Sequence, residues 1–339
     1  MMSRWDLAAM MLVLALGAGG GANCAAQEKT ARPALLVLSK DANELEIVDP
    51  GTLKIVGRAT TGPVPHEVAV SDDGKIAVAT NYGPHMDGTS LSVIDLDAQK
   101  EIHRVELANL KGPAGQDFGS LTGPHGVEFF AGRFYFTAEG AKKIARYDLA
   151  TNRVNWEHAL GQSRTHMLVI AKTTFTIYTA NVNSDSVTVV AAPATDTVIA
   201  TGKGPEGIDV SPDEKEVWAA NSGDGTVSVI DTATKKVVAT LNVGTKHSNR
   251  VKFTPDGKRV LISDLGTGDL LVMDAKSRQL VKTLSMGKNA EGILIPPDGA
   301  LAFVAASGDD KVKIVDLKTL AVTGEIDGIR DPDGMAWRK

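Results

Sequence analysis

Seven polar residues recur at one position of a repeated pattern, and the first three of them are histidines. The pattern is a proline or small residue, then the polar residue, then an apolar run, as in "PHGVEF" at residues 124–129. The seven positions hold His66, His125, His166, Glu206, Asn249, Glu291 and Asp333. Imidazole and carboxylate groups bind divalent metals and act as general acids and bases. Their chemistry here depends on whether the fold brings the seven positions together.

The spacing of these positions reveals an internal repeat. Successive intervals are 59, 41, 40, 43, 42 and 42 residues, which is a period near 42 with one insertion. Each unit contains four short apolar or alternating runs separated by turn-forming residues, and this predicts four β-strands, a to d. In the unit from Pro205 the runs are "GIDV", "EVWAA", "TVSVI" and "KKVVATLNV". Repeats of this length and content are typical of β-propeller blades.

The two ends of the repeat region predict how the ring closes. The region opens with strands b, c and d only, at "ALLVLS", "ELEIVD" and "KIVGRATTG", and it ends with a lone strand a, "GMAW". Each end carries what the other lacks, so the two should pair within one blade and leave no free edge. We therefore predict an all-β fold, a seven-bladed β-propeller of four-stranded antiparallel blades, over residues 34–339.

An aspartate ends strand c in six of the seven units. A carboxylate at this place can accept hydrogen bonds from backbone N–H groups two residues on, so we interpret the series as turn-forming rather than catalytic. The six residues are Asp49, Asp95, Asp148, Asp231, Asp274 and Asp316.

The first 26 residues are expected to be a secretory signal, followed by a short linker over residues 27–33. An apolar run from Leu7 to Leu16 precedes the small residues Cys24, Ala25 and Ala26, which predicts cleavage near Ala26 and a periplasmic or extracellular protein. Asn23 disfavours a lipid anchor on Cys24, because such signals place a small residue before the cysteine.

Composition excludes several function classes for the mature chain. Cys24 is the only cysteine, so cleavage removes any disulfide or thiolate metal site, and the absence of C-x-x-C-H excludes covalent haem. The formal net charge of -5 gives no reason to expect a nucleic-acid partner. No segment approaches the apolar length of a transmembrane helix.

From about Ala34 to Trp337 the chain resembles the YVTN-repeat β-propeller family. The closest copy of the family pattern is "VWAANSGDGTVSVIDTATKKVVATLNVG" at residues 217–244, and the units with "YFTAEG" and "SVTVV" depart from it. The resemblance implies a secreted or periplasmic propeller and brings no assigned activity with it.

In a propeller, strand a lines the central channel, so the seven polar positions should surround one channel mouth. The loop "NYGPHMDGTS", with His85 and Asp87, is expected on the same face. Cationic residues stand three positions before the channel residue in the last four units and should form an arc that attracts anions. They are Lys203, Lys246, Lys288 and Arg330.

Two functions fit this mouth. The first is a non-catalytic scaffold that binds a small anionic ligand or a protein partner. The alternative is a metal-dependent hydrolase or lyase, similar to lactonases on other propellers, in which zinc is held by His66, His125 and His166. The general base in that case is one of Glu206, Glu291, His85 and Asp87.

Without a metal, each histidine would bond only the neighbouring blade or water. A redox accessory that resembles the propeller subunits of quinoprotein dehydrogenases is disfavoured, because the chain offers no covalent haem or disulfide chemistry.

Overall fold

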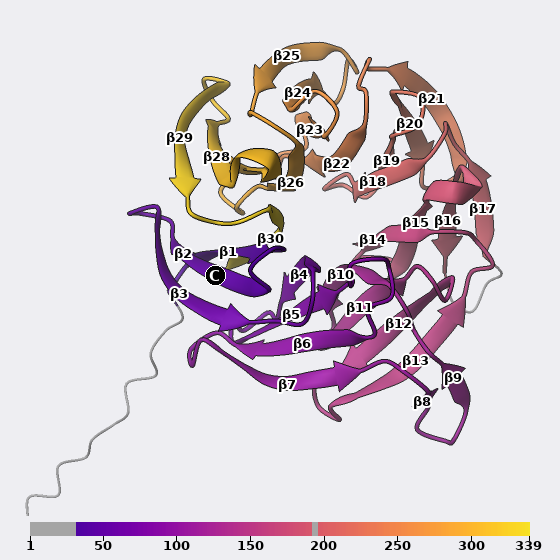
Figure 1. Cartoon of the computed structure of the whole chain (residues 1–339). Helices are drawn as coiled ribbons and strands as arrows, with labels where there is room; N and C mark the ends of the chain where they lie inside the picture. Colours follow the sequence, from indigo (N-terminus) through magenta and orange to yellow (C-terminus); the bar gives the residue numbers. More distant parts are fainter. Residues whose placement is uncertain (1–31, 192–195) are drawn as a thin grey trace, which may run out of the picture. The chain divides into compact units, whose positions relative to one another are not determined.

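Seven four-stranded antiparallel sheets surround a common axis in the computed structural model, which describes residues 32–191 and 196–339. Figure 1 shows the sheets as the blades of a ring. The only helical segments among the described residues are two short 3-10 turns, η1 (Val182–Ser184) and η2 (Ser307–Asp309). No helix in this part of the chain has the length and apolar character needed to span a bilayer. The prediction of a seven-bladed β-propeller is confirmed, while the expected signal segment and Cys24 lie outside the described residues.

Six blades are formed from consecutive strands that run from the channel outward. Blade 2 contains β4 (Pro65–Val70), β5 (Ile76–Asn81), β6 (Ser90–Asp95) and β7 (Lys100–Glu106). Blade 3 contains β10 (Pro124–Phe130), β11 (Arg133–Ala138), β12 (Lys143–Asp148) and β13 (Arg153–Ala159). Blade 4 contains β14 (Thr165–Ala171), β15 (Thr176–Asn181), β16 (Ser186–Val190) and β17 (Thr197–Ala200). Blade 5 contains β18 (Pro205–Val210), β19 (Glu216–Asn221), β20 (Thr226–Asp231) and β21 (Lys236–Asn242). Blade 6 contains β22 (Ser248–Phe253), β23 (Arg259–Asp264), β24 (Asp269–Asp274) and β25 (Leu280–Ser285). Blade 7 contains β26 (Ala290–Leu294), β27 (Leu301–Ala306), β28 (Lys311–Asp316) and β29 (Ala321–Asp327).

Blade 1 joins the two ends of the ring, as the sequence predicts. Its strands are β1 (Ala34–Ser39), β2 (Glu44–Asp49), β3 (Lys54–Thr60) and the last strand of the chain, β30 (Pro332–Arg338). Leu35 of β1 stands opposite Trp337 of β30 in an antiparallel ladder. In Figure 1 the indigo and yellow ends of the colour scale therefore meet in one blade. The pairing supplies the inner strand that β1, β2 and β3 lack.

The hydrophobic core lies between adjacent blades. Leu36 of blade 1 packs in one cluster with Val68 and Ala77 of blade 2, and similar clusters fill the other interfaces. The insertion between blades 2 and 3 adds the hairpin β8 (Leu110–Lys111) and β9 (Asp117–Gly119). Its apolar residues Phe118 and Leu121 are buried in the core of these two blades rather than exposed. The insertion thus contributes to the hydrophobic core between blades 2 and 3.

A β-bulge at the start of each inner strand aims the channel residue at the axis. In blade 3 the register between β10 and β11 shifts between Pro124 and Val127, and the other blades shift at the equivalent place. Thr137 of β11 accepts a hydrogen bond from Gly126 N (2.9 Å) and donates one to His166 O of the next blade (2.7 Å). A bulge re-aims side chains, and this hydroxyl fixes it against both blades.

Glycine follows the channel residue in four of the seven units because neighbouring inner strands touch there. A Cβ on Gly207 would lie 2.7 Å from Arg250 Cα, and a Cβ on Gly334 would lie 2.2 Å from His66 O. Neither contact is sterically allowed for a larger residue without backbone movement. The absence of a Cβ at these glycines therefore allows neighbouring inner strands to pack closely.

The aspartates that end strand c form turns, as expected. Asp231 accepts a hydrogen bond from Thr234 N at 2.7 Å, and Asp316 accepts one from Thr319 N at 2.6 Å. Asp49, Asp95 and Asp148 accept backbone N–H bonds in the same way. Their carboxylates are therefore committed to local structure.

Candidate metal centre at the channel mouth

The seven channel residues surround one mouth, and several neighbours in the ring are in contact. The His125 and His166 rings lie 3.8 Å apart between centroids, and those of His66 and His125 lie 4.9 Å apart. His66 Nδ1 is 2.9 Å from Asp333 Oδ2, which closes the ring across the chain ends. Residues more than 250 positions apart in the sequence thus share one site.

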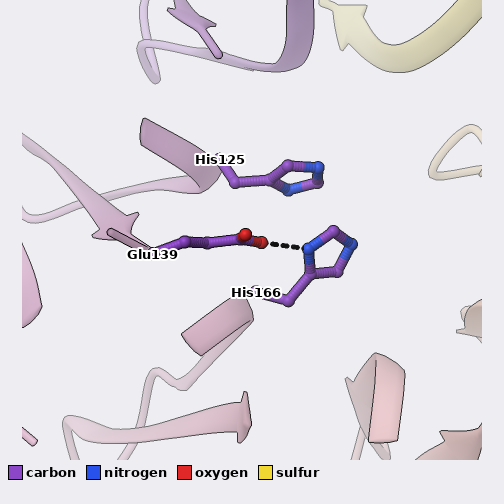
Figure 2. Close-up of side chains that lie close together, drawn as sticks. All are labelled: His125, Glu139 and His166. Atoms are coloured by element: carbon purple, nitrogen blue, oxygen red, sulfur yellow. Dashed lines mark hydrogen bonds and ion pairs between the residues drawn. The ribbon is translucent and has the colours of Figure 1, made fainter. Parts of the chain in front are cut away.

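One half of the mouth brings two histidines and a glutamate together. Figure 2 shows the side chains of His125, Glu139 and His166 pointing at a common point, from β10, from the residue after β11 and from β14. A possible ligand atom from each residue lies within 4.8 Å of the others. His166 Nδ1 and Glu139 Oε1 are hydrogen-bonded. His66 is outside this group.

The imidazoles of this group are buried and keep unpartnered nitrogens. His125 and His166 are 1% and 4% exposed, and Glu139 is 3% exposed. Neither His125 Nδ1 nor His166 Nε2 makes a hydrogen bond within the described part of the chain. Buried polar atoms are rarely left without partners, so the free Nδ1 of His125 indicates a missing ligand or water, while the Nε2 of His166 lies toward Glu206.

Two further residues hold the Glu139 carboxylate. The Tyr82 hydroxyl donates a hydrogen bond to Glu139 Oε2 at 2.6 Å, and its ring contacts those of His66 and His125. Arg164 Nε lies 3.6 Å from Glu139 Oε2. The carboxylate is therefore oriented from two sides.

Glu206 continues this half of the mouth beyond His166. Its Oε1 is 3.6 Å from His166 Nε2 and accepts a hydrogen bond from Asn249 Nδ2 at 3.1 Å. Its Oε2 is 3.1 Å from Nε2 of the half-exposed His247. We call this side of the mouth the open half; it consists of Tyr82, His125, Glu139, Arg164, His166, Glu206 and His247.

The opposite side contains a closed network of ion pairs. Lys40 Nζ lies 2.6 Å from Glu291 Oε2, 3.2 Å from Asp331 Oδ1 and 3.8 Å from Asp333 Oδ2. Ser307 donates to the other oxygen of Glu291 at 2.9 Å. Lys40 thus links the first strand of the repeat region to its last.

Arg250 completes that network. It donates to Glu67 through Nε at 3.0 Å, to Asn249 Oδ1 at 2.9 Å and to Asp333 Oδ1 at 3.4 Å. We call this side the paired half; it consists of Lys40, His66, Glu67, Arg250, Glu291, Asp331 and Asp333. Each of its charged groups has an opposite charge within 4 Å.

Burial and charge set the protonation of the open half. Burial, with the nearby His166, lowers the pKa of His125 well below its ordinary value, which keeps this imidazole neutral. Burial acts to raise the pKa of Glu139, but the contacts with His166, Tyr82 and Arg164 outweigh it and lower the pKa. Burial also opposes ionisation of Glu206, yet bonds to His247 and the charges of its neighbours lower its pKa to about 2.

The paired half contains the opposite perturbation. Burial, with the adjacent Asp333 carboxylate, raises the pKa of Glu291 to about 7 despite its bond to Lys40. Burial also opposes the charge of Lys40, but Asp333, Glu291 and Asp331 raise its pKa above the ordinary value.

The remaining predicted residues lie on the surface. His85 and Asp87 are exposed in the loop after β5. Arg330 is exposed and donates to Asp41 O at 2.8 Å. The rest of the predicted cationic arc is exposed on the connections that lead into the inner strands, at Lys203, Lys246 and Lys288.

Sequence reasoning missed the residues that follow strand b. Lys40, Tyr82, Glu139 and Ser307 all stand directly after that strand, and all reach the channel residues. A usable signal for Glu139 is the departure "YFTAEG", where the chain breaks its own repeat. Where one unit departs from the repeated pattern, its residue has a role other than forming the common fold.

The residues of the open half fit a divalent metal ion. Around a tetrahedral zinc, ligand atoms are about 3.4 Å apart, given metal–ligand distances of about 2.1 Å. The ligand atoms now lie up to 4.8 Å apart, so metal binding would require side-chain rotation to bring them to this spacing. Metal-bound histidines usually donate their other N–H to a carboxylate, and ligating carboxylates are hydrogen-bonded. Glu206 beside His166 Nε2 and Tyr82 beside Glu139 already occupy these two supporting positions.

Comparison with known proteins supports the fold. The family described as "YNCE-like beta-propeller" matches residues 157–325. The match supports a β-propeller family and does not specify the YVTN-repeat family. Among curated protein sequences, none matches the chain.

Solved structures with the same fold have varied functions. Hydrazine synthase from Kuenenia stuttgartiensis superposes with a TM-score of 0.72 at 18% identity, over 84% of this chain and 92% of that chain. A functionally unknown protein from Desulfotomaculum acetoxidans DSM 771 gives 0.73 at 14% identity, over 90% and 98%. A putative 6-phosphogluconolactonase from Bacteroides uniformis ATCC 8492 gives 0.72 at 14% identity, over 90% and 99%. At these identities the likeness shows the fold alone.

Proposed function

We propose that this propeller is a ligand-binding scaffold whose channel mouth captures a small ligand through a divalent metal ion, zinc in the first instance. His125, Glu139 and His166 hold the ion. The observation that carries the proposal is the buried, unpartnered Nδ1 of His125 in one cluster with the imidazole of His166 and the oriented carboxylate of Glu139. Two histidines and one carboxylate leave a position of a tetrahedral ion open to a ligand.

The ligand set differs from the one that sequence alone suggests. His66 bonds Asp333 in the paired half, whereas Glu139 bonds His166 directly. The proposal therefore keeps His125 and His166 and replaces His66 with Glu139.

Metal binding tests the proposal. Wild-type protein prepared without chelator should hold about one zinc ion per chain, because the three ligands form a single site. Glu139→Gln, which keeps the side-chain shape and loses the charge, should weaken zinc binding at least about 100-fold, since the ligand itself is removed. The measurement is isothermal titration with zinc, together with elemental analysis.

His66→Gln is the matched control, because His66 occupies the same repeat position in the same mouth. This variant should bind zinc like the wild type. A folded wild-type protein that holds no zinc would contradict the proposal, and so would a Glu139→Gln variant with unchanged affinity. If His66→Gln alone lost zinc, the three-histidine set would be correct instead.

A second candidate function is metal-dependent hydrolysis, which the open coordination position favours. Sites with three protein ligands and one free position are typical of catalytic zinc. A bound zinc would supply a Lewis acid and an activated water, while Tyr82 holds the Glu139 carboxylate in place. Zinc-loaded protein should then hydrolyse a simple lactone or ester, and Glu139→Gln should be inactive. Inert zinc-loaded protein would leave the binding scaffold as the function.

Export to the periplasm or the cell exterior is part of the proposal. It rests on the apolar run and small residues of the first 26 positions. N-terminal sequencing of the mature protein from the producing cell should begin near residue 27, and a retained Met1 would contradict export by cleavage.

A further inference from the structure

Arg164 stands at the channel mouth, where its side chain is loosely paired with Glu139 and Arg164 Nε makes no hydrogen bond within the described part of the chain. Its side chain is 37% exposed, and the nearest acidic atom, Glu139 Oε2, is 3.6 Å from its Nε. That Nε is buried and makes no hydrogen bond of ordinary geometry within the described residues. A guanidinium group offers five N–H donors, so this one has donors to spare.

The backbone of Arg164 is fixed in place to present that group. Arg164 has a φ of 55° and stands directly before β14, the strand that carries His166. Its carbonyl oxygen accepts a hydrogen bond from Val182 N at 2.9 Å. The guanidinium therefore extends from a defined turn toward the metal ligands, with one side open to solvent.

Arg164 lies within electrostatic reach of four other residues of the open half. Its positive charge acts to lower the pKa values of His125, Glu139 and Tyr82. The same charge acts on His247 across the mouth. The guanidinium is consequently close enough to favour negative charge among these groups.

A bound divalent ion reverses the charge of the open half. Glu139 and Glu206 together outnumber Arg164 by one negative charge, and both imidazoles of the ligand set are neutral when they bind a metal. Two positive charges from the ion leave the group with at least one net positive charge. Charge complementarity then favours an anion at the open coordination position.

The outer rim adds to this preference. Lys203 and Lys246 are exposed on the connections that lead to Glu206 and Asn249, and their backbone N–H groups are fixed by Asp224 and Asp264 at 2.7 and 2.8 Å. Such exposed charges contribute little to binding once an anion is seated, but they raise its rate of encounter.

We propose that the ligand class of this site is a small carboxylate that bridges the metal ion and the Arg164 guanidinium. The inference rests on the proposed metal site. One carboxylate oxygen occupies the open metal position, and the other accepts a charge-assisted hydrogen bond from Arg164. Planar, forked donors match a carboxylate well, which distinguishes arginine from lysine at such a place.

Cobalt-substituted protein provides the test, because the visible spectrum of Co²⁺ reports a change in its ligands. Acetate added at constant ionic strength and pH should shift the spectrum of the wild type and saturate, whereas acetamide, its neutral isostere, should not. Arg164→Gln, loaded with cobalt to the same content as the wild type, should bind acetate about 10- to 100-fold more weakly, as expected for loss of a hydrogen bond between charged groups. Arg164→Lys should fall between the two.

Arg153 provides a matched control, since it is an exposed arginine of blade 3 outside the mouth. Arg153→Gln should bind acetate like the wild type. The inference is overturned if acetate leaves the spectrum of cobalt-loaded protein unchanged. It is also overturned if Arg164→Gln binds acetate as well as the wild type does. Either result leaves the proposed metal site intact. Protein that takes up no cobalt at all fails at the earlier step and overturns the proposed function together with the inference.

Discussion

Both halves of the channel mouth contain nearly fully buried polar residues, but the halves differ in whether those residues have hydrogen-bond or charge partners. In the paired half, Arg250 is 4% exposed and lies between Glu67 and Asp333, so every charge has a partner. In the open half, His125 is 1% exposed and its Nδ1 has no partner within the described residues. A buried charge that is fully paired is consistent with structure alone, whereas a buried lone pair with nothing to accept points to a ligand.

The largest expected effect comes from breaking the paired half. Arg250→Met removes the cation that neutralises Glu67 and Asp333, and it should cost about 3–5 kcal/mol of unfolding free energy because buried carboxylates lose their counter-charge. Arg164→Met, the matched change in the open half, should cost less than about 1 kcal/mol, since Arg164 is partly exposed. Denaturant unfolding of both variants measures the difference. Equal losses would mean that the two halves do not differ in the way described.

A smaller effect is expected on metal affinity from the residue that orients Glu139. Tyr82→Phe removes the hydroxyl that donates to Glu139 and should weaken zinc binding by about 10- to 100-fold. Zinc titration measures this, with Tyr178→Phe in the core of blade 4 as a control of unchanged affinity. Full zinc affinity in Tyr82→Phe would show that the carboxylate is oriented without help.

The smallest effect concerns the pH dependence of the paired half. The folded state raises the pKa of Glu291 to about 7, so this group is protonated in the folded chain and ionised in the unfolded chain between its ordinary value and pH 7. Folding then binds a proton, and the contribution of Glu291 to stability falls as pH rises through this window.

Glu291→Gln should remove that decline. The unfolding free energy of the variant minus that of the wild type should increase by on the order of 1 kcal/mol as the pH rises from 4.5 to 7.5. Denaturant unfolding at each pH measures this difference. Lys40 keeps Asp331 and Asp333 as partners throughout, so its own contribution should change little. A difference between variant and wild type that stays constant with pH would contradict the raised pKa.

The fold was predictable from sequence because the same pattern of strands and turns recurs in each repeat unit. The recurring Asp at the end of strand c, as in Asp231 and Asp316, forms the same turn wherever it occurs. The missing strand a at one end and the lone "GMAW" at the other determine the closure. Local turn chemistry and strand patterning act within a few residues, so one chain displays them directly.

The candidate site was predictable only in part. Repeat equivalence identified His125, His166 and Glu206, because the same position of each unit lies on the inner strand. It could not identify Glu139 or Arg164, which stand at other positions of the repeat and reach the same point only through the bulges and the ring.

The sequence by itself determined the number of blades, the way the ring closes and the polar character of the channel mouth. Only the tertiary structure decided which polar groups are neutralised and which remain available. That decision assigned His66 to Asp333 and His166 to Glu139. The reason is physical: pairing energies depend on distances of a few ångströms and on exclusion of water, and both arise only when blades far apart in the chain close around one axis.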